Sequence, residues 1–211
     1  MKIDCKPNEV ARRIIQAFPR EYNERDPFRV LVNTILSQRT RDENTDEASR
    51  RLFSKYKGPA SIANARAEDL YELVRPAGMY RQKAERIVSV ARELLKRYQG
   101  KVPSEIHKLL ELPGVGRKTA NIVLNVSFGI PALAVDTHVH RISNRLGWVK
   151  TKMPEDTERE LTNLLEEELW GPINGSMVEF GRKLCKPRKP LCDNCPVKQC
   201  CDSYLASKNS Y

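Results

Sequence analysis

Apolar residues recur every three or four positions along most of the chain, which is the spacing of a helix with one buried face. The clearest stretch runs from Ala84 to Tyr98, and shorter ones cover residues 10–18, 48–56 and 161–169. Each stretch stops at a glycine or a proline, the residues that most often end a helix. No alternating run of apolar and polar residues predicts a strand. The pattern therefore predicts an all-α fold built from many short helices.

Composition narrows the function classes. The chain has 211 residues, enough for one large domain or two small ones, and its 37 Lys and Arg against 27 Asp and Glu give a formal charge of +10. That excess favours a polyanionic partner. The longest weakly polar stretch, residues 122–135, is interrupted by Asn125, Gly129 and Pro131, so it predicts core and no membrane partner. The first residues lack the apolar run of a signal peptide, so we expect a cytoplasmic protein.

Five of the six cysteines lie between Cys185 and Cys201. In a compartment that keeps thiols reduced, this density favours a metal site or catalysis over disulfides. The candidate ligands are separated by six, two and five residues: Cys185, Cys192, Cys195 and Cys201. Thiolates at such spacing bind zinc or an iron–sulfur cluster, and their chemistry alone leaves both open.

Charged residues gather in two runs. The acidic run, residues 155–168, is expected to be a solvated helix face. The basic run, residues 182–189, lies beside the cysteines, and prolines stiffen its last part. We expect Lys186, Arg188 and Lys189 to contact phosphate.

Residues 109–120 join two apolar-periodic helices through a turn with Gly114 and Gly116 at alternate positions. Glycine permits positive φ and the close approach of another backbone. At a helix N-terminus, unpaired N–H groups and the helix dipole together form an anion site that a phosphodiester fits. A simple connection between two helices is the alternative. The predicted phosphate contacts are Gly114, Val115, Gly116, Arg117 and Thr119.

Two motifs carry a family resemblance. Leu-Pro-Gly-Val-Gly-Arg-Lys-Thr-Ala at 112–120 and Val-Asp-Thr-His-Val-His-Arg at 135–141 closely resemble the helix–hairpin–helix DNA glycosylases of the endonuclease III family. Residues 35–42 look like the early helix motif of that family and residues 78–84 like its central motif. The cysteine tail is similar to its iron–sulfur loop, and the motifs follow the family's order over essentially the whole chain.

The resemblance implies a fold with two lobes and an active cleft between them. Residues 21–130 would form a helical barrel domain that carries the helix–hairpin–helix at about 105–128. Residues 1–20 and 131–211 would form an iron–sulfur cluster domain.

Lys118 and Asp136 occupy the positions of the family's catalytic lysine and aspartate. The resemblance implies a base excision repair enzyme, a DNA glycosylase with AP lyase activity, in which the Lys118 amine attacks the sugar and the Schiff base drives β-elimination. Asp136, facing it across the domain boundary, would activate the amine and stabilise the cationic sugar. The positive helix end and Arg117 disfavour the ammonium form of Lys118. From the residues alone, Lys118 could be a solvated helix lysine and Asp136 a helix N-cap.

Two residues are candidates for opening the duplex. By resemblance, Met79 lies where the family places an apolar wedge, and Arg39 falls where endonuclease III has a glutamine that fills the void left by the flipped base. The alternatives are core packing beside Leu73 and Val74 for Met79, and a solvated helix face for Arg39. Because arginine prefers guanine acceptors, the preference for the opposite base stays open.

The expected substrates are damaged, oxidised pyrimidines in duplex DNA. Uracil or thymine mispaired with guanine is the alternative, and a non-catalytic iron–sulfur module that binds DNA is a second alternative. The resemblance implies one four-iron four-sulfur cluster, mainly structural, on the four candidate cysteines, with Cys5 and Cys200 as ordinary small residues.

The expected partner is double-stranded DNA that contains damaged bases or abasic sites. We expect a monomer associated with the nucleoid. Neutralising about five phosphates would give a logarithmic salt dependence of binding of about −4.5.

Overall fold

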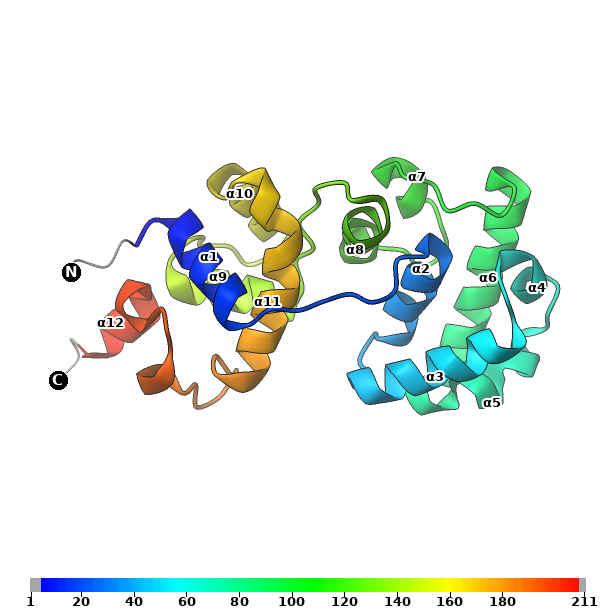
Figure 1. Ribbon diagram of the computed structural model, residues 1–211, viewed down its shortest axis with the longest axis horizontal. Helices are drawn as coiled ribbons and strands as arrows, with labels where there is room; N and C mark the ends of the chain where they lie inside the picture. The colour runs from blue at the N-terminus through cyan, green and yellow to red at the C-terminus, as the bar shows by residue number, and fades with distance from the viewer. Residues whose placement is uncertain (1–4, 209–211) are drawn as a thin grey trace. The chain divides into compact units, whose positions relative to one another are not determined.

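The computed structural model describes residues 5–208 and divides the chain into two compact units (Figure 1). Unit 1 combines Met1–Tyr22 with Pro131–Tyr211, and unit 2 is Asn23–Ile130. All regular elements of the described residues are helices, so the prediction of an all-α fold is confirmed. None of these helices is both long enough and apolar enough to span a membrane.

Prolines define where several helices begin. Pro7, Pro27, Pro59 and Pro154 stand in the first turns of helices α1, α2, α4 and α10, where a missing N–H costs nothing. Helix α3 ends at Lys55, and α4 begins four residues later at Pro59.

Unit 2 is a cluster of helices around α6, the longest of its helices. Its helices and helical turns are α2 (Pro27–Leu36), α3 (Asp42–Lys55), α4 (Pro59–Ala63), η1 (Ala67–Leu70), α5 (Tyr71–Val74), η2 (Arg75–Ala77), α6 (Tyr80–Tyr98), α7 (Ile106–Leu110) and α8 (Arg117–Phe128). The apolar face predicted for α6 is buried: Ala84, Ile87 and Leu94 are fully inaccessible. Helix α6 packs against α4, and α2 packs against α8.

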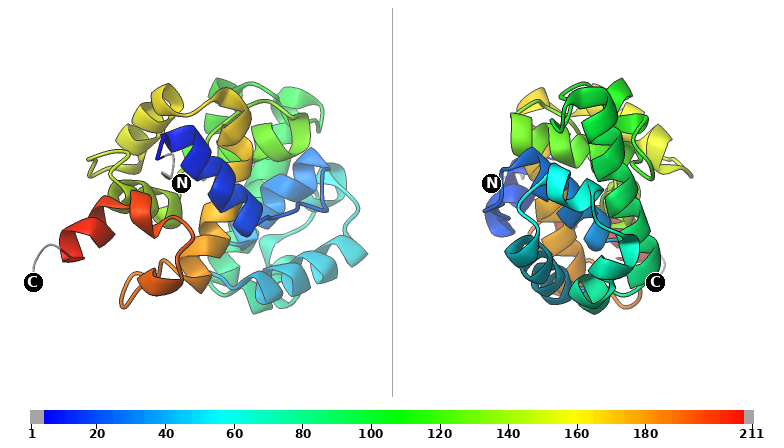
Figure 2. Two further views of the ribbon diagram at one scale, coloured as in Figure 1. Left: turned by 60° about the vertical axis from the view of Figure 1, so that its left-hand side comes forward. Right: turned by 90° about the vertical axis from the view of Figure 1, so that its right-hand side faces the viewer.

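Unit 1 combines two segments that are far apart in the sequence. Its helices and helical turns are α1 (Pro7–Ala17), α9 (Thr137–Leu146), α10 (Pro154–Leu164), η3 (Glu167–Leu169), α11 (Trp170–Lys183), η4 (Cys192–Asn194), η5 (Lys198–Cys200) and α12 (Asp202–Lys208). Its core contains the fully buried Ile14, Val139, Leu161 and Ile173, one each from α1, α9, α10 and α11. Figure 2 shows these segments from two further directions, α1 in blue and the helices of the second segment in yellow-green to red.

One predicted helix end was wrong. The stretch 161–169 was expected to stop at Gly171-Pro172, but α10 already ends at Leu164, and α11 begins at Trp170 and runs through this pair. Pro172 falls in the first turn of α11, where its missing N–H has no partner to lose. The Trp170 indole N–H donates to the carbonyl of Leu165 at 3.0 Å and fixes the break between the two helices.

Candidate functional site

The glycine turn connects α7 to α8 in unit 2. The N–H of Val115 donates to the carbonyl of Leu112 at 3.1 Å and closes the turn. Gly114 has a φ of 70°, so its backbone is in the left-handed region. A Cβ at Gly114 would stand 2.2 Å from Nε of Arg86, which comes from α6. Gly116 is the N-cap of α8.

The residues of this turn differ in their exposure to solvent. Gly114, Gly116 and Arg117 are exposed, whereas Val115 and Thr119 are only 6% and 4% exposed. The last two side chains pack inside unit 2, and the N–H of Val115 already donates to the carbonyl of Leu112, so neither side chain is available to a phosphate.

Lys118 stands in the first turn of α8, two residues after the N-cap Gly116. Its side chain is exposed. Buried neighbours in the same turn, Thr119 and Ala120, fix the helix face that Lys118 occupies.

Asp136 is the N-cap of α9 in unit 1, as its local sequence predicts. Its Oδ1 accepts hydrogen bonds from the N–H groups of His138 and Val139, at 2.8 and 2.9 Å. Both printed bonds use one oxygen, so the half-buried carboxylate has a fixed orientation, and within residues 5–208 Oδ2 accepts no hydrogen bond.

A chain of contacts leads from this N-cap to the first cysteine. Nδ1 of His138 lies 3.2 Å from Nη2 of Arg141, and the same Nη2 donates to the carbonyl of Cys185 at 2.9 Å. Burial lowers the pKa of Arg141, and the neighbouring Cys185 partly opposes this. Gly181 leaves the room for the imidazole, because a Cβ there would stand 2.3 Å from Nδ1 of His138.

Arg39 and Met79 both have left-handed backbones, with φ of 52° and 43°. Arg39 is exposed, as the alternative of a solvated residue predicts, but it lies in the turn after α2 and not on a helix face. Met79 is 45% exposed at the N-cap of α6, which excludes the core-packing alternative. A positive φ is uncommon for residues other than glycine and costs free energy that the surrounding structure must supply.

Lys83 is the residue of this region that the sequence analysis missed. Its side chain is 2% exposed, and its Nζ donates to Leu36 O, Thr40 Oγ1 and Ala77 O, each at 2.7 Å. Burial and the neighbouring Arg86 lower the pKa of Lys83 to about 8. One signal could have found it: Lys83 lies four residues before the buried Ile87, on the apolar face of α6.

Four cysteines line one cavity in unit 1. Cys185, Cys192, Cys195 and Cys201 are free, half-buried and surround a space of about 290 Å³ that is otherwise mostly apolar. Burial and, to a smaller extent, the other three sulfurs raise the pKa of the Cys195 thiol to about 11. The residues from 5 to 208 hold no group of three or more His, Cys, Asp or Glu side chains arranged for a metal ion.

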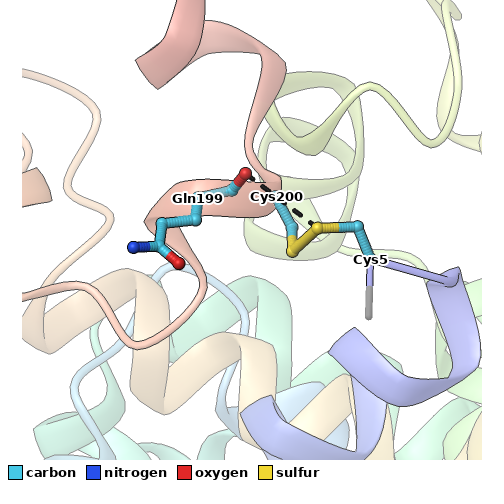
Figure 3. Close-up of a disulfide and its surroundings, with 3 residues drawn as sticks. All are labelled: Cys5, Gln199 and Cys200. Carbon is cyan, nitrogen blue, oxygen red and sulfur yellow. Dashed lines mark hydrogen bonds between the residues drawn. A yellow bond between two sulfur atoms is a disulfide. The ribbon is translucent and has the colours of Figure 1, made fainter. Parts of the chain in front are cut away.

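The prediction for the remaining two cysteines was wrong. Cys5 and Cys200 form a disulfide with a Cα–Cα distance of 5.2 Å, so they are not ordinary small residues (Figure 3). The prediction failed because the partners are 195 residues apart and meet only when α1 packs in the same unit as the cysteine tail. Cys200 is bonded elsewhere, which leaves Cys201 as the fourth cysteine of the cavity.

Arg145 holds the loop that follows Cys185. Its guanidinium donates to the carbonyls of Lys186 and Pro187 at 2.7 and 2.8 Å, and Nη1 lies 3.4 Å from Sγ of Cys185. The carbonyl of Arg145 accepts from the Cys201 thiol at 3.2 Å. With the loop backbone fixed in this way, the side chains of Lys186, Arg188 and Lys189 are all exposed.

Comparison with protein families gives one match that covers most of the chain. Residues 32–167 match the HhH-GPD superfamily of base excision DNA repair proteins. Endonuclease III of Thermotoga maritima is 64% identical over 93% of this chain and 92% of its own length. Endonuclease III of Bacillus subtilis is 38% identical over 83% of this chain and 81% of its own.

Comparison with solved structures also finds endonuclease III. A non-covalent endonuclease III–DNA complex superposes with a TM-score of 0.89 at 34% identity and covers 99% of this chain and 100% of that chain. A trapped covalent endonuclease III–DNA intermediate gives 0.88 at the same identity, over 98% of this chain and 100% of that chain. A thermostable thymine-DNA glycosylase gives 0.84 at 26% identity, over 94% of each chain.

Proposed function

The chain belongs to the endonuclease III family of helix–hairpin–helix DNA glycosylases, and from this premise we propose that Lys118 and Asp136 carry out its chemistry. The protein is a base excision repair DNA glycosylase and AP lyase, and its partner is duplex DNA with damaged bases. The observation that carries the assignment is the exposed amine of Lys118 in the first turn after the glycine turn.

The glycine turn and the lysine would act on one stretch of DNA strand. Main-chain N–H groups at the start of α8 bind a phosphate, and the helix dipole favours its negative charge. A phosphate held there brings the attached sugar within reach of Lys118. Contacts of this kind position the strand and carry no sequence information.

The Lys118 amine then attacks C1′ of the extruded nucleotide. A bond forms between Nζ and C1′, and the bond from C1′ to the base breaks, so the base leaves with the electron pair. Opening of the sugar ring gives a Schiff base. Loss of a proton from C2′ and cleavage of the bond from C3′ to its oxygen release the 3′ phosphate and nick the strand.

Asp136 contributes a carboxylate that does not have to reorient. Oδ1 is fixed by two N–H groups of α9, which leaves Oδ2 to face the reacting sugar. A preorganised negative charge stabilises the positive charge that develops on the sugar as the base leaves. The same oxygen would accept a proton from the Lys118 ammonium.

A substitution of Lys118 tests the assignment. We expect Lys118→Gln to lose strand cleavage and the covalent adduct that borohydride traps, while it still binds abasic DNA. Lys101→Gln, another exposed lysine of unit 2, is the matched control and should keep both activities. Normal strand cleavage by Lys118→Gln would refute Lys118 as the nucleophile.

We further propose that Arg39 and Met79 enter the DNA stack. Both side chains are exposed on short turns with strained backbones, a combination typical of functional sites. Met79 would fill the space left between base pairs as an apolar wedge, and Arg39 would hydrogen-bond the orphaned base.

Oxidised pyrimidines are the proposed substrates. A second candidate, thymine or uracil opposite guanine, is favoured by two observations: Arg39 suits guanine acceptors, and a thymine-DNA glycosylase shares the fold at 26% identity. A panel of single-lesion duplexes decides between them. Faster single-turnover excision from the mispairs than from oxidised pyrimidines would favour the second candidate.

The four free cysteines are proposed to hold one four-iron four-sulfur cluster. Zinc would place its thiolates about 2.3 Å from a single ion, whereas a cavity of about 290 Å³ suits a larger group. When bound, the group supplies cross-links that hold the loop 186–191 in place. Visible absorption with bound iron and sulfide is the expected result, and a colourless protein with one zinc after anaerobic isolation would refute the proposal.

The two units receive different roles in this proposal. Unit 2 would be the helical barrel domain with the hairpin, and unit 1 the cluster domain. The protein would act as a monomer on chromosomal DNA in the cytoplasm.

A further inference from the structure

A lysine is buried among apolar residues in the middle of unit 2. Lys83 is 2% exposed, while its helix neighbours Ala84 and Ile87 are fully buried. Burying an ammonium group is costly unless its hydrogens are all bonded. Lys83 meets this condition, because its ammonium group donates three hydrogen bonds.

Each bond of Lys83 ends on one of two chain turns. One acceptor is the carbonyl of Leu36, the last residue of α2, and another is the hydroxyl of Thr40, which closes the turn after it. The third is the carbonyl of Ala77, the last residue of η2. Thr40 also donates to Ala77 O, so the three acceptors form one connected network.

Arg39 and Met79 lie on these two turns. Arg39 stands between Leu36 and Thr40, and Met79 follows Ala77 by two residues. Both have positive φ, at 52° and 43°, so both turns are in conformations that an unsupported chain rarely adopts. Three bonds from one ammonium group supply support to both.

A second residue of α6 extends the same brace. Arg86, one turn after Lys83, donates from Nη1 to Oε1 of Gln38 at 2.8 Å. Its side chain also packs against Gly114 of the hairpin turn. Helix α6 therefore contacts all three turns of unit 2 that carry proposed DNA contacts.

We propose that Lys83 is a positioning residue for DNA opening, which holds the Arg39 and Met79 turns ready to enter the base stack. The inference rests on the proposed roles of those two residues. The ordering of the turns takes place when the protein folds, so the DNA complex does not have to supply that free energy. Without Lys83 the turns relax, and extrusion of the damaged nucleotide slows.

The test separates base extrusion from the chemistry that follows. Lys83→Met removes the ammonium and keeps most of the apolar stem, and Thr40→Val removes one acceptor with little change of shape. Lys96→Met, an exposed lysine of the same helix, is the matched control. Circular dichroism and the visible absorption of the cluster establish that each variant is folded.

Two readouts are compared for each variant. Stopped-flow fluorescence of 2-aminopurine beside the lesion reports unstacking, and single-turnover excision reports the complete reaction. Strand cleavage at an abasic site prepared beforehand needs no base to be removed from the stack. We expect Lys83→Met to slow unstacking and excision by about 10- to 100-fold and to leave cleavage of the prepared site within about threefold of wild type.

The outcomes of these measurements either support or overturn the positioning role of Lys83. Equal losses in excision and in cleavage of the prepared site would indicate a merely structural role and overturn the proposal, as would wild-type unstacking in Lys83→Met. If Lys83→Met does not fold, Thr40→Val decides, because unchanged unstacking there overturns the proposal. Met79→Ala tests separately the wedge role on which the inference about Lys83 rests. If this variant unstacks DNA at the wild-type rate, the wedge role of Met79 has failed. Failure of Lys118 as nucleophile does not alter the fluorescence result.

Discussion

Gly114 packs directly against Arg86. A Cβ at Gly114 would lie 2.2 Å from Nε of that arginine and 2.5 Å from its Cδ, while φ at Gly114 is +70°. Two independent constraints, the left-handed backbone and the contact with α6, therefore require glycine at this position of the hairpin.

Gly114→Ala should lower the free energy of unfolding by about 1–3 kcal/mol, because it adds backbone strain and displaces Arg86. Chemical denaturation followed by circular dichroism measures the loss. Gly116→Ala is the control, since φ there is −96° and no atom lies within 4 Å of its Cβ position. Equal losses of unfolding free energy in the two variants would contradict a role for the contact between Gly114 and Arg86.

Arg39→Gln should change the preference for the base opposite the lesion. If the guanidinium reads guanine acceptors, the ratio of excision rates opposite guanine and adenine should fall by an amount worth about 1–3 kcal/mol. Single-turnover kinetics on paired duplexes give the ratio. Arg50→Gln, an exposed arginine of α3, controls for the loss of one charge, and an unchanged ratio in Arg39→Gln would remove the proposed contact.

Neutralising the exposed loop after Cys185 should reduce the salt dependence of DNA binding. If Lys186, Arg188 and Lys189 each contact one phosphate, their triple replacement by Gln lowers the logarithmic slope by about 2.7. Titrations at several salt concentrations measure the slope. Lys152→Gln removes one exposed charge of unit 1 outside the loop and should leave the slope unchanged. The same slope in the triple variant would show that the loop does not touch the DNA backbone.

The Cys5–Cys200 disulfide should stabilise unit 1. Cys5→Ser is expected to lower the free energy of unfolding by about 2–4 kcal/mol, because the open chain gains conformational entropy when it unfolds. The visible absorption expected of the proposed cluster should not change, since neither sulfur is one of the four that line the cavity. A thiol reductant should destabilise the wild type and leave Cys5→Ser unaffected; equal responses would contradict the disulfide's contribution.

The lowered pKa of Lys83 predicts a pH dependence of stability. Burial lowers the pKa of Lys83 to about 8 in the folded protein, against 10.5 for the unfolded chain, so between these pH values the folded protein binds fewer protons. The free energy of unfolding of the wild type, relative to Lys83→Met, should therefore be constant below pH 8 and rise from pH 8 towards 10.5. Denaturation of both proteins across this range measures the difference, and a difference independent of pH would contradict the shift.

Local patterns predicted the features that depend on neighbours in the sequence. The buried face of α6 follows from apolar residues at helical spacing, and Asp136 caps α9 because its carboxylate reaches the N–H groups two and three residues further on. The end of α10 was missed because a proline is tolerated in a first turn, and the sequence does not mark which turn comes first.

Features that depend on distant parts of the chain escaped the sequence analysis. The oxygen of Leu36 is 47 residues from Lys83, and Cys200 is 195 residues from Cys5. The catalytic assignment of Lys118 came from resemblance, because an exposed lysine in a first helical turn has no local signature of reactivity.

The division of the chain also sets an order of assembly during synthesis. Unit 2, Asn23–Ile130, is one uninterrupted segment and can fold as soon as it leaves the ribosome. Helix α1 emerges earlier but must wait for α9, α10 and α11 before its apolar face finds its partners. The four sulfurs that line the cavity emerge after unit 2 and after α9, α10 and α11. If these sulfurs hold the proposed cluster, iron and sulfide are inserted only after the unit that carries the hairpin is already complete.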